Sequence, residues 1–283
     1  MYYLGCDLGS TTGKVVILKQ ENGQVEWVAD AVEPSGFSPM ETSNVTMARA
    51  LERGGLSRTD IASTCATGYG RESVTWADIN MSEISCHGRG AHFLCNDCRT
   101  IIDVGGQDVK VISITEKGKV VDFAMNDKCA AGTGRFFEAM ARTLRVSVEE
   151  LGRLALKGTE PVSISSTCSV FAESEVITAI NKGADRANIA AGIHESIARR
   201  LVGMVNRVGL AKEVVLTGGC AKNPGLQQAL TELLGVSVIT PPCDPQLNGA
   251  LGAALFACSN ENSAPSIEGR LADAAPLCEG CRL

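Results

Sequence analysis

Residues 7–14 of the 283-residue chain read DLGSTTGK and follow the short apolar run 2–6. This order predicts a strand, a tight polar turn and a returning strand. Glycine lets a backbone approach a phosphate closely, and hydroxyl and N–H groups bind phosphate oxygens. A carboxylate at a strand end suits Mg²⁺, which keeps much of its hydration shell. We therefore interpret Asp7 as a catalytic candidate and the following polar residues as nucleotide-binding candidates: Ser10, Thr11, Thr12 and Lys14. The rival interpretation of the motif is an ordinary hairpin turn. Separately, the strand register could direct Lys14 to solvent.

A second stretch repeats this pattern at residues 103–108, which read DVGGQD after the apolar run 100–102. Asp103 is a second candidate for holding Mg²⁺ or orienting water, and Gly105 and Gly106 offer backbone N–H groups. Gln107 is a candidate for positioning the attacking water, as a glutamine does in some nucleotide hydrolases. A plain glycine-rich turn is again the alternative. The two half-chains thus begin alike, which indicates a weak internal repeat.

A third glycine motif lies at residues 216–224, LTGGCAKNP, where a predicted strand meets a predicted helix. Paired glycines suit a nucleoside lying flat on the backbone. Its candidates for nucleotide binding are Gly218, Gly219, Lys222 and Asn223, and we add Gln246 further along the chain.

These three motifs, in this order, resemble the ATPase superfamily that contains acetate and sugar kinases, Hsp70 chaperones and actin. The resemblance implies an α/β fold of two duplicated, RNase H-like halves, with ATP and Mg²⁺ in a cleft between them. A P-loop is excluded, because no G-x-x-x-x-G-K-[ST] occurs. We expect a first half at residues 1–97, a second at 98–258 and a tail at 259–283.

Hydrophobic periodicity and turn residues predict the elements in more detail. Strands are expected at 61–66, 109–114, 119–124, 213–217 and 236–239. Helices are expected at 40–53, 82–94, 132–145, 147–155, 171–182, 186–208, 223–234 and 247–257.

Two cysteines stand just ahead of predicted helices. Residues 126–137 read NDKCAAGTGRFF, with Cys129 in a loop, and residues 165–171 read SSTCSVF, with Cys168 at a helix start. Free N–H groups and the positive end of the helix dipole favour an anionic ligand there. A [4Fe–4S] cluster normally takes four thiolates, so two copies of the chain would supply a full set. Inert buried thiols are the alternative. We expect Gly132, Thr133 and Gly134, which follow Cys129, to face the nucleotide.

Both cysteine motifs, with 67–71 (TGYGR), 83–88 (EISCHG) and 102–110 (IDVGGQDVK), closely resemble the ATP-dependent activators of 2-hydroxyacyl-CoA dehydratases. The wider family, of BadF/BadG/BcrA/BcrD type, includes ATPase subunits of benzoyl-CoA reductase, and the resemblance covers residues 3–257. It implies a homodimer that binds ATP/ADP and Mg²⁺ and holds one bridging [4Fe–4S] cluster on Cys129 and Cys168. It also implies ferredoxin or flavodoxin as electron donor, and an iron–sulfur dehydratase or a related double-cubane reductase as acceptor.

The composition of the chain argues against several classes of function. A net charge of −6 argues against nucleic-acid binding through phosphate contacts. No run of about 18 apolar residues predicts a membrane span, and the start lacks the features of a signal peptide. We therefore expect a cytoplasmic protein, in which twelve cysteines indicate metal or redox chemistry more than disulfides.

Other cysteines and two rival functions remain open. Two C-x-x-C pairs, Cys95/Cys98 and Cys278/Cys281, have the ligand count of a zinc site but an unusual separation, and we interpret them chiefly as surface thiols. Core roles are expected for Cys6, Cys65, Cys220 and Cys258, and packing or cleft-lining roles for Cys86 and His87. The main alternative function is a small-molecule kinase of the same fold without a cluster. A chaperone-like ATP-gated binding protein is the third.

Overall fold

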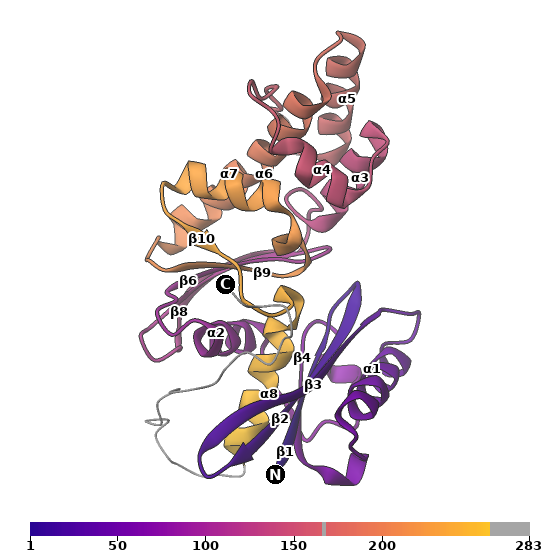
Figure 1. Cartoon of the computed structure of the whole chain (residues 1–283), viewed down its shortest axis with the longest axis vertical. Coiled ribbons are helices and arrows are strands. Elements are labelled where there is room, and N and C mark those ends of the chain that lie inside the picture. Colours follow the sequence, from indigo (N-terminus) through magenta and orange to yellow (C-terminus); the bar gives the residue numbers. More distant parts are fainter. Residues whose placement is uncertain (166–167, 261–283) are drawn as a thin grey trace. The chain divides into compact units, whose positions relative to one another are not determined.

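The computed structural model describes residues 1–165 and 168–260. Two compact units can be distinguished (Figure 1). Unit 1 contains residues 1–96 and 242–260, and unit 2 contains residues 97–241. Each unit is built on its own five-stranded sheet and is described by itself.

The sheet of unit 1 has the strand order β3-β2-β1-β4-β5. The central strand β1 pairs antiparallel with β2 and parallel with β4. Strand β1 is buried on both faces, so its sequence is almost continuously apolar. The strand bounds are β1 Tyr2–Leu8, β2 Thr12–Glu21, β3 Gln24–Pro34, β4 Ile61–Thr67 and β5 Ile79–Asn80.

Alternation along β1 assigns its side chains to two separate cores. Tyr3 belongs to a core that includes residues of α8 (Asn248–Asn260) and α2 (Glu83–Leu94). Leu4 belongs to a second core that includes residues of α1 (Pro39–Gly54). Asp7 shares the parity of Tyr3, so it lies on the face of β1 that α8 covers.

The sheet of unit 2 has the order β10-β9-β6-β7-β8, which repeats the arrangement of unit 1. Its central strand β6 again pairs antiparallel with the next strand, β7, and parallel with a later strand, β9. This shared order confirms the predicted duplication. The bounds are β6 Thr100–Val104, β7 Val109–Ile114, β8 Val120–Asn126, β9 Val214–Thr217 and β10 Val238–Ile239.

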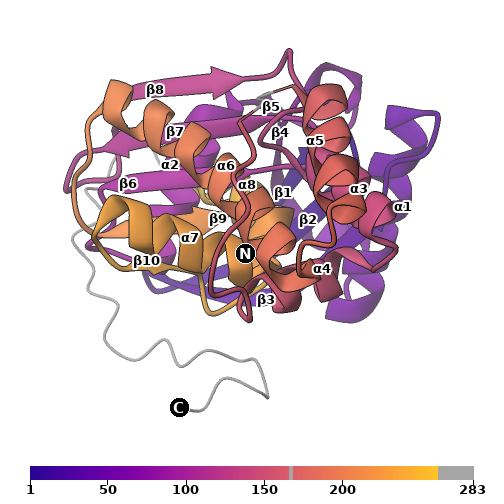
Figure 2. The ribbon, with the colours of Figure 1, turned by 90° about the horizontal axis from the view of Figure 1, so that it is seen from above.

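The helices and strands of unit 2 share an apolar core that includes Phe136, Phe137 and Met140 of α3. Figure 2 shows the helices of this unit from above. Helix α6 begins after Asp185, whose carboxylate accepts from two backbone N–H groups, and ends at Gly209. The predicted range 186–208 is therefore confirmed. The bounds are α3 Gly134–Leu144, α4 Val148–Ala155, α5 Ser169–Asn181, α6 Arg186–Val208 and α7 Pro224–Leu234.

Two features differ from the expected organisation. Helix α8 belongs to unit 1, whereas the sequence suggested one continuous second half at 98–258. The physical reason is close packing, since a Cβ on Gly5 of β1 would lie 2.1 Å from the backbone oxygen of Ala250. The long strand β3 and the short strand β5 were not predicted. The expected tail and the pair Cys278/Cys281 lie outside the described residues.

Within residues 1–165 and 168–260, no helix combines the length and hydropathy needed to cross a membrane.

Candidate functional site

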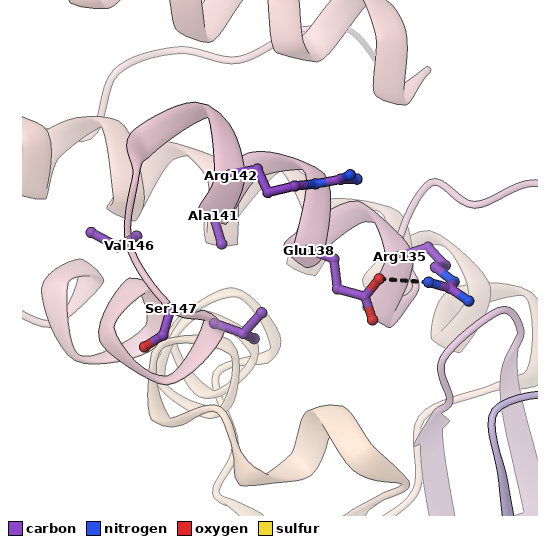
Figure 3. Close-up of a pocket in the computed structure, with 7 residues that line it drawn as sticks. Arg135, Glu138, Ala141, Arg142, Val146 and Ser147 are labelled. Atoms are coloured by element: carbon purple, nitrogen blue, oxygen red, sulfur yellow. Dashed lines mark hydrogen bonds and ion pairs between the residues drawn. The ribbon is translucent and has the colours of Figure 1, made fainter. Parts of the chain in front are cut away.

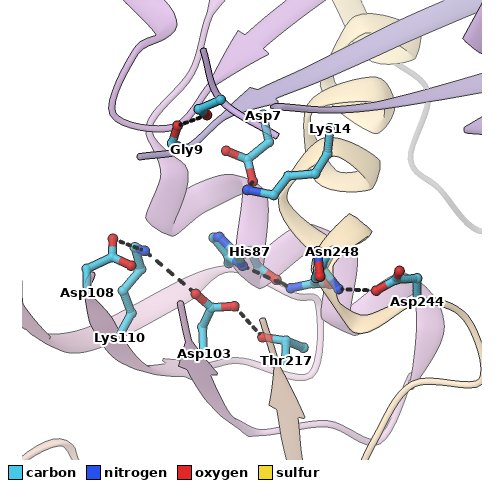
Figure 4. Close-up of polar contacts among 12 residues, drawn as sticks. Asp7, Gly9, Lys14, His87, Asp103, Asp108, Lys110, Thr217, Asp244 and Asn248 are labelled. Carbon is cyan, nitrogen blue, oxygen red and sulfur yellow. Dashed lines mark hydrogen bonds and ion pairs between the residues drawn. The ribbon is translucent and has the colours of Figure 1, made fainter. Parts of the chain in front are cut away.

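The first candidate site, which we call the Asp7 site, lies at the end of β1. Asp7 is opposite Lys14 in the antiparallel register of β1 and β2. Lys14 Nζ lies 3.3 Å from Asp7 Oδ2 (Figure 4), and both side chains are largely buried. Lys14 is therefore directed to the carboxylate and not to solvent.

Backbone contacts fix the turn that follows Asp7. The N–H of Gly9 donates to the carbonyl of Thr12 at 3.1 Å, and the N–H of Ser35 donates to the carbonyl of Thr11 at 2.9 Å. The Ser35 hydroxyl also donates to the carbonyl of Gly9 at 3.1 Å. Ser10 is exposed, while Thr11 and Thr12 are half-buried. The turn thus keeps a defined shape with polar groups at its surface.

The second candidate site, the Asp103 site, lies at the end of β6 in unit 2. Lys110 Nζ lies 3.6 Å from Asp103 Oδ2 and 2.7 Å from Asp108 Oδ2. The hydroxyl of Thr217 in β9 donates to Asp103 Oδ1 at 2.7 Å (Figure 4). Asp103 and Lys110 are each only 3% exposed, so this charge cluster is shielded from water.

Both sites use equivalent sheet positions. The aspartate of each central strand faces a lysine on the antiparallel neighbour, as the registers Asp7–Lys14 and Asp103–Lys110 show. The parallel neighbour places a threonine beside each aspartate, Thr67 and Thr217. Lys110 and Thr217 were not named as site residues from the sequence. The equal spacing from Asp7 to Lys14 and from Asp103 to Lys110 was the signal that could have found Lys110.

Three glycine segments meet at the Asp103 site. The N–H groups of Gly134 and Arg135, at the start of α3, donate to the carbonyls of Gly105 and Gly106, both at 2.9 Å. Gly218 has φ +83°, and a Cβ there would lie 2.4 Å from the carbonyl oxygen of Val104. Only glycine fits this approach without displacement of the backbone. The structure therefore joins the ends of β6 and β9 to the beginning of α3.

The remaining predicted residues of unit 2 fall into two groups. Gln107 and Lys222 are exposed near these loops, and Gly219 begins the short 3₁₀ turn that contains Lys222. Thr133 is buried at the start of α3, where its hydroxyl donates to the carbonyl of Ala130 at 2.7 Å, and Gly132 just before it has φ +89°. These two residues therefore shape the loop that joins Cys129 to α3.

Asn223 has an internal role in the structure. Its Oδ1 accepts from the N–H of Leu226 at 3.2 Å and so caps α7. The same oxygen lies 3.0 Å from Nε2 of His194 in α6, whose Nδ1 lies 2.7 Å from the carbonyl oxygen of Ala190. The pKa of His194 is lowered, because the effect of burial is larger than that of these two contacts, which raise the pKa. In unit 1, Gln246 is half-buried in a 3₁₀ turn, where its N–H donates to Asp244 Oδ1 at 3.0 Å.

Cys129 and Cys168 are exposed, and each lies at the approach to a helix. Asn126 holds the Cys129 loop, because its Nδ2 donates to the Cys129 carbonyl at 2.8 Å. Cys168 occupies the N-cap position of α5. Helices α3 and α5 share the core of unit 2, and a hydrogen bond of 2.9 Å joins Thr143 Oγ1 to Glu173 Oε1. The two cysteine-bearing segments thus lead into helices that pack in one layer.

The other described cysteines are less accessible. Cys6, Cys65, Cys86, Cys98 and Cys258 are buried, and Cys95, Cys220 and Cys243 are half-buried. Burial raises the pKa of the Cys220 thiol to about 12, with smaller contributions from the charges of Asp103 and Glu138. A neutral thiol of this kind is a poor metal ligand. In the part of the chain that the structure describes, no group of three or more histidine, cysteine or carboxylate side chains is arranged to hold a metal ion.

Two cavities lie on the helical side of unit 2 and contain none of the predicted site residues. One, of about 360 Å³, lies by α3 and the start of α4, where Arg135 and Glu138 form an ion pair of 2.9 Å (Figure 3). The other, of about 490 Å³, lies between α3 and α5. Their lining residues are Arg135, Glu138, Ala141, Arg142, Val146, Ser147 and Val148 in the first, and Ala139, Arg142, Thr143, Glu173 and Ile177 in the second.

Comparison with known proteins connects this geometry to a family. The model of the BadF/BadG/BcrA/BcrD ATPase family matches residues 4–257. The chain belongs to this family. It is the family that the motifs of the sequence predicted.

Members of this family with assigned activities are similar over almost their whole length. The (R)-2-hydroxyglutaryl-CoA dehydratase activating ATPase of Acidaminococcus fermentans is 50% identical, over 91% of this chain and 97% of the relative. One of the subunits of benzoyl-CoA reductase from Thauera aromatica is 34% identical, over 89% and 91%. The structure of the activator of the 2-hydroxyisocaproyl-CoA dehydratase from Clostridium difficile with bound ADPNP is 44% identical, with a TM-score of 0.85 and coverage of 94% and 100%.

More distant likeness is limited to the fold. A ROK family glucokinase from Streptomyces griseus has a TM-score of 0.56 at 11% identity, over 92% of this chain and all of that one. The chain therefore has the predicted actin/Hsp70-like ATPase fold of two duplicated α/β halves.

Proposed function

We propose that this ATPase is an activator that hydrolyses ATP in order to deliver a low-potential electron to a partner iron–sulfur enzyme. The partner class is a 2-hydroxyacyl-CoA dehydratase or a related double-cubane reductase. The names of relatives that are 34–50% identical along the chain support this class. The observation that carries the proposal is the pair of hydrogen bonds from the start of α3 to Gly105 and Gly106.

In this proposal the two strand-end sites perform the nucleotide chemistry. Asp7 and Asp103 hold Mg²⁺ and its water ligands, as carboxylates at strand ends are suited to do. Gln107, which is exposed beside the Asp103 site, orients the attacking water. The buried Lys110 supplies a compensating charge 3.6 Å from the Asp103 carboxylate. The bound ADPNP in a relative of 44% identity supports nucleotide binding of this type.

The polar turn after Asp7 and the glycine loops bind the phosphates and the nucleoside. Backbone N–H groups in glycine-rich turns are suited to phosphate oxygens. The proposed contacts are made by Ser10, Thr11, Thr12, Lys14, Gly105, Gly106, Gly132, Thr133, Gly134, Gly218, Gly219, Lys222, Asn223 and Gln246.

The donor set of unit 2 fits an iron–sulfur cluster shared by two chains. Cys129 and Cys168 are exposed thiols at the approaches to two helices, and thiolates are the usual ligands of such a cluster. A [4Fe–4S] cluster on these thiolates would supply a reversible one-electron carrier. The described part of one chain contains no group of three metal ligands, so a second chain with the same two cysteines would complete the set of four.

Exposed apolar residues next to Cys168 support association of two chains. Val170 and Phe171, in the first turn of α5, are 68% and 66% exposed, and Ile177 lies further along the same helix at 45%. Exposed apolar groups of this size gain free energy when a partner covers them. We propose that a second copy covers this part of α5 in a homodimer.

In this proposal, backbone hydrogen bonds couple the nucleotide site to the position of Cys129. Movement of the Gly105–Gly106 loop pulls on the first turn of α3, because Gly134 and Arg135 donate to it. The Cys129 loop leads directly into that turn. A change at the Asp103 site therefore reorients the segment that holds Cys129. Other nucleotide-binding proteins are switched in a similar way, because the bound nucleotide orders a segment or shifts a helix. The proposed electron donor is ferredoxin or flavodoxin.

ATP hydrolysis tests the nucleotide part of the proposal. The anaerobically purified protein is expected to hydrolyse Mg-ATP, and Asp103→Asn is expected to lower kcat by about 100-fold or more, as loss of a preorganised charge does. Lys128→Met, at an exposed ion pair with Asp127, is the control and should retain the wild-type rate. Unchanged hydrolysis by Asp103→Asn would contradict the assigned role.

Iron and sulfide analysis tests the cluster part. Cys129→Ala is expected to remove the iron while ATP binding is retained, and Cys95→Ala, at a half-buried thiol, should keep the iron. Phosphoryl transfer to a small metabolite that is unaffected by Cys129→Ala would instead favour the kinase alternative.

A further inference from the structure

His87 in α2 is buried beside the Asp7 site without being part of the predicted machinery. A Cβ on Gly249, at the start of α8, would lie 2.8 Å from Asp7 Oδ2 and 3.1 Å from His87 Nε2. Both atoms therefore border the same small space, which exists because residue 249 has no side chain. Figure 4 shows the imidazole ring and the carboxylate in this region of unit 1.

Asn248 determines which nitrogen of His87 carries the proton. Its side-chain Nδ2 lies 3.1 Å from the backbone oxygen of His87 and 3.2 Å from the ring Nδ1. A carbonyl oxygen is only an acceptor, so the Asn248 atom next to it must be the NH₂ group. The same NH₂ group then donates to Nδ1, and a neutral ring with Nδ1 as acceptor carries its proton on Nε2. The N–H group is thus on the side of the ring that borders Asp7.

Close helix packing keeps this arrangement in place. A Cβ on Gly90 of α2 would lie 2.2 Å from the backbone oxygen of Asn248, and a Cβ on Gly252 of α8 would lie 1.8 Å from the backbone oxygen of Cys86. Helices α2 and α8 therefore approach so closely that neither His87 nor Asn248 can move far. Asn248 is fully buried, and its Oδ1 has no hydrogen-bond partner among the described residues. A buried amide that leaves one end unsatisfied calls for a functional reason.

We propose that His87 is a positioning residue for Asp7, with Asn248 fixing its tautomer. Asp7 Oδ2 then faces two positive or donating groups, Lys14 Nζ at 3.3 Å and the Nε2–H edge of His87. They hold the carboxylate in one orientation. The inference rests on the proposed function, in which Asp7 orients the hydrated Mg²⁺ of bound ATP. It gives a specific role to His87, for which the sequence suggested either packing or lining of a cleft.

ATP hydrolysis by matched histidine variants of the full-length protein tests the proposal. His87→Leu is expected to lower kcat, and to raise the Mg²⁺ concentration at half-maximal rate, by about 10- to 100-fold, as loss of a group that orients a metal ligand does. His87→Gln retains a side-chain N–H donor and should recover most of this loss, which a purely structural role would not predict. His92→Leu, at a half-buried histidine of the same helix, should behave as wild type. Wild-type rates and Mg²⁺ dependence in His87→Leu would overturn the proposal.

Nitrogen-15 NMR of the wild-type protein tests the tautomer without any requirement that a variant folds. The chain has only three histidines, so the His87→Gln and His92→Leu spectra assign their signals. We expect a protonated Nε2 and a bare Nδ1 for His87; the opposite tautomer would overturn the proposal. If the wild-type protein hydrolyses no ATP, the proposed function fails, while the NMR measurement still decides the geometry of His87.

Discussion

Lys110 is the most strongly buried cation among the residues that the structure describes at the two candidate sites. Its side chain is 4% exposed between Asp103 and Asp108, at 3.6 and 2.7 Å. Removal of one partner from such a cluster leaves uncompensated charge in a poorly hydrated place. The cluster therefore depends on all its members, although a buried ion pair as a whole contributes little net stability.

We predict that Lys110→Met lowers the free energy of unfolding by about 3–5 kcal/mol, the range observed when one member of a buried pair is removed. Urea denaturation monitored by circular dichroism measures this loss. Lys128→Met, whose ion pair with Asp127 is exposed, should change it by less than about 1 kcal/mol. Equal effects of the two substitutions would show that Lys110 is not in a buried charge cluster.

His194 gives a second prediction at the residue scale. Its folded-state pKa is lowered, chiefly by burial, so the unfolded chain binds the extra proton more readily than the folded protein does. The contribution of His194 to stability is therefore complete above its ordinary pKa of about 6.5 and is lost as the pH falls from there towards the folded-state pKa. Unfolding in urea at pH 5.5 and pH 7.5 should show greater stability at pH 7.5. His194→Gln should reduce that difference, and an unchanged difference would contradict the assignment.

At the scale of elements, the glycine loops hold β6, β9 and α3 together. Gly218 combines a positive φ of +83° with a backbone oxygen 2.4 Å from the position of a Cβ. Gly235 also has a positive φ, of +66°, but a Cβ there would meet no atom within 4 Å. An alanine at Gly235 would therefore introduce backbone strain alone, whereas an alanine at Gly218 would introduce both backbone strain and a steric clash.

We predict a graded series of alanine variants. Gly203→Ala, in the middle of α6 with open space around it, should stabilise the protein by about 0.5–1 kcal/mol. Gly235→Ala should cost about 1–2 kcal/mol from backbone conformation alone. Gly218→Ala should cost more than Gly235→Ala, because its Cβ also displaces the end of β6. Thermal unfolding of the three variants gives the order, and a smaller effect at Gly218 than at Gly235 would contradict the close approach of β6 and β9.

Sequence patterns predicted individual elements well where the local signals were complete. Helix α6 was predicted at its observed bounds, because Asp185 and Gly209 mark its two ends. Strand β3 was missed, since its alternation of exposed and half-buried residues gives a weak apolar pattern. The start of α3 at Gly134 depends on the hydrogen bond from Gly134 to Gly105. These residues are far apart in sequence, so the local pattern does not indicate this start.

At the scale of the whole molecule, the duplicated fold could be predicted from the order of the Asp–Gly motifs. The family itself was predicted from the motifs around Cys129 and Cys168 together with residues 67–71, 83–88 and 102–110. The assignment of α8 to unit 1 could not be predicted, because it depends on glycines far apart in sequence, such as Gly5 and Gly252, that admit close packing. The direction of Lys14 was ambiguous for a related reason. It depends on the strand register, which brings Lys14 opposite Asp7.

The central claim is that two copies of this chain share one iron–sulfur cluster through Cys129 and Cys168. Native mass spectrometry of the anaerobically purified protein tests it most directly, since it weighs the chains and the cluster together. We predict a species of two chains with one [4Fe–4S] cluster, about two iron atoms per chain. We also predict loss of the cluster in Cys168→Ala. An iron-free monomer, or a complete cluster on a single chain, would contradict it.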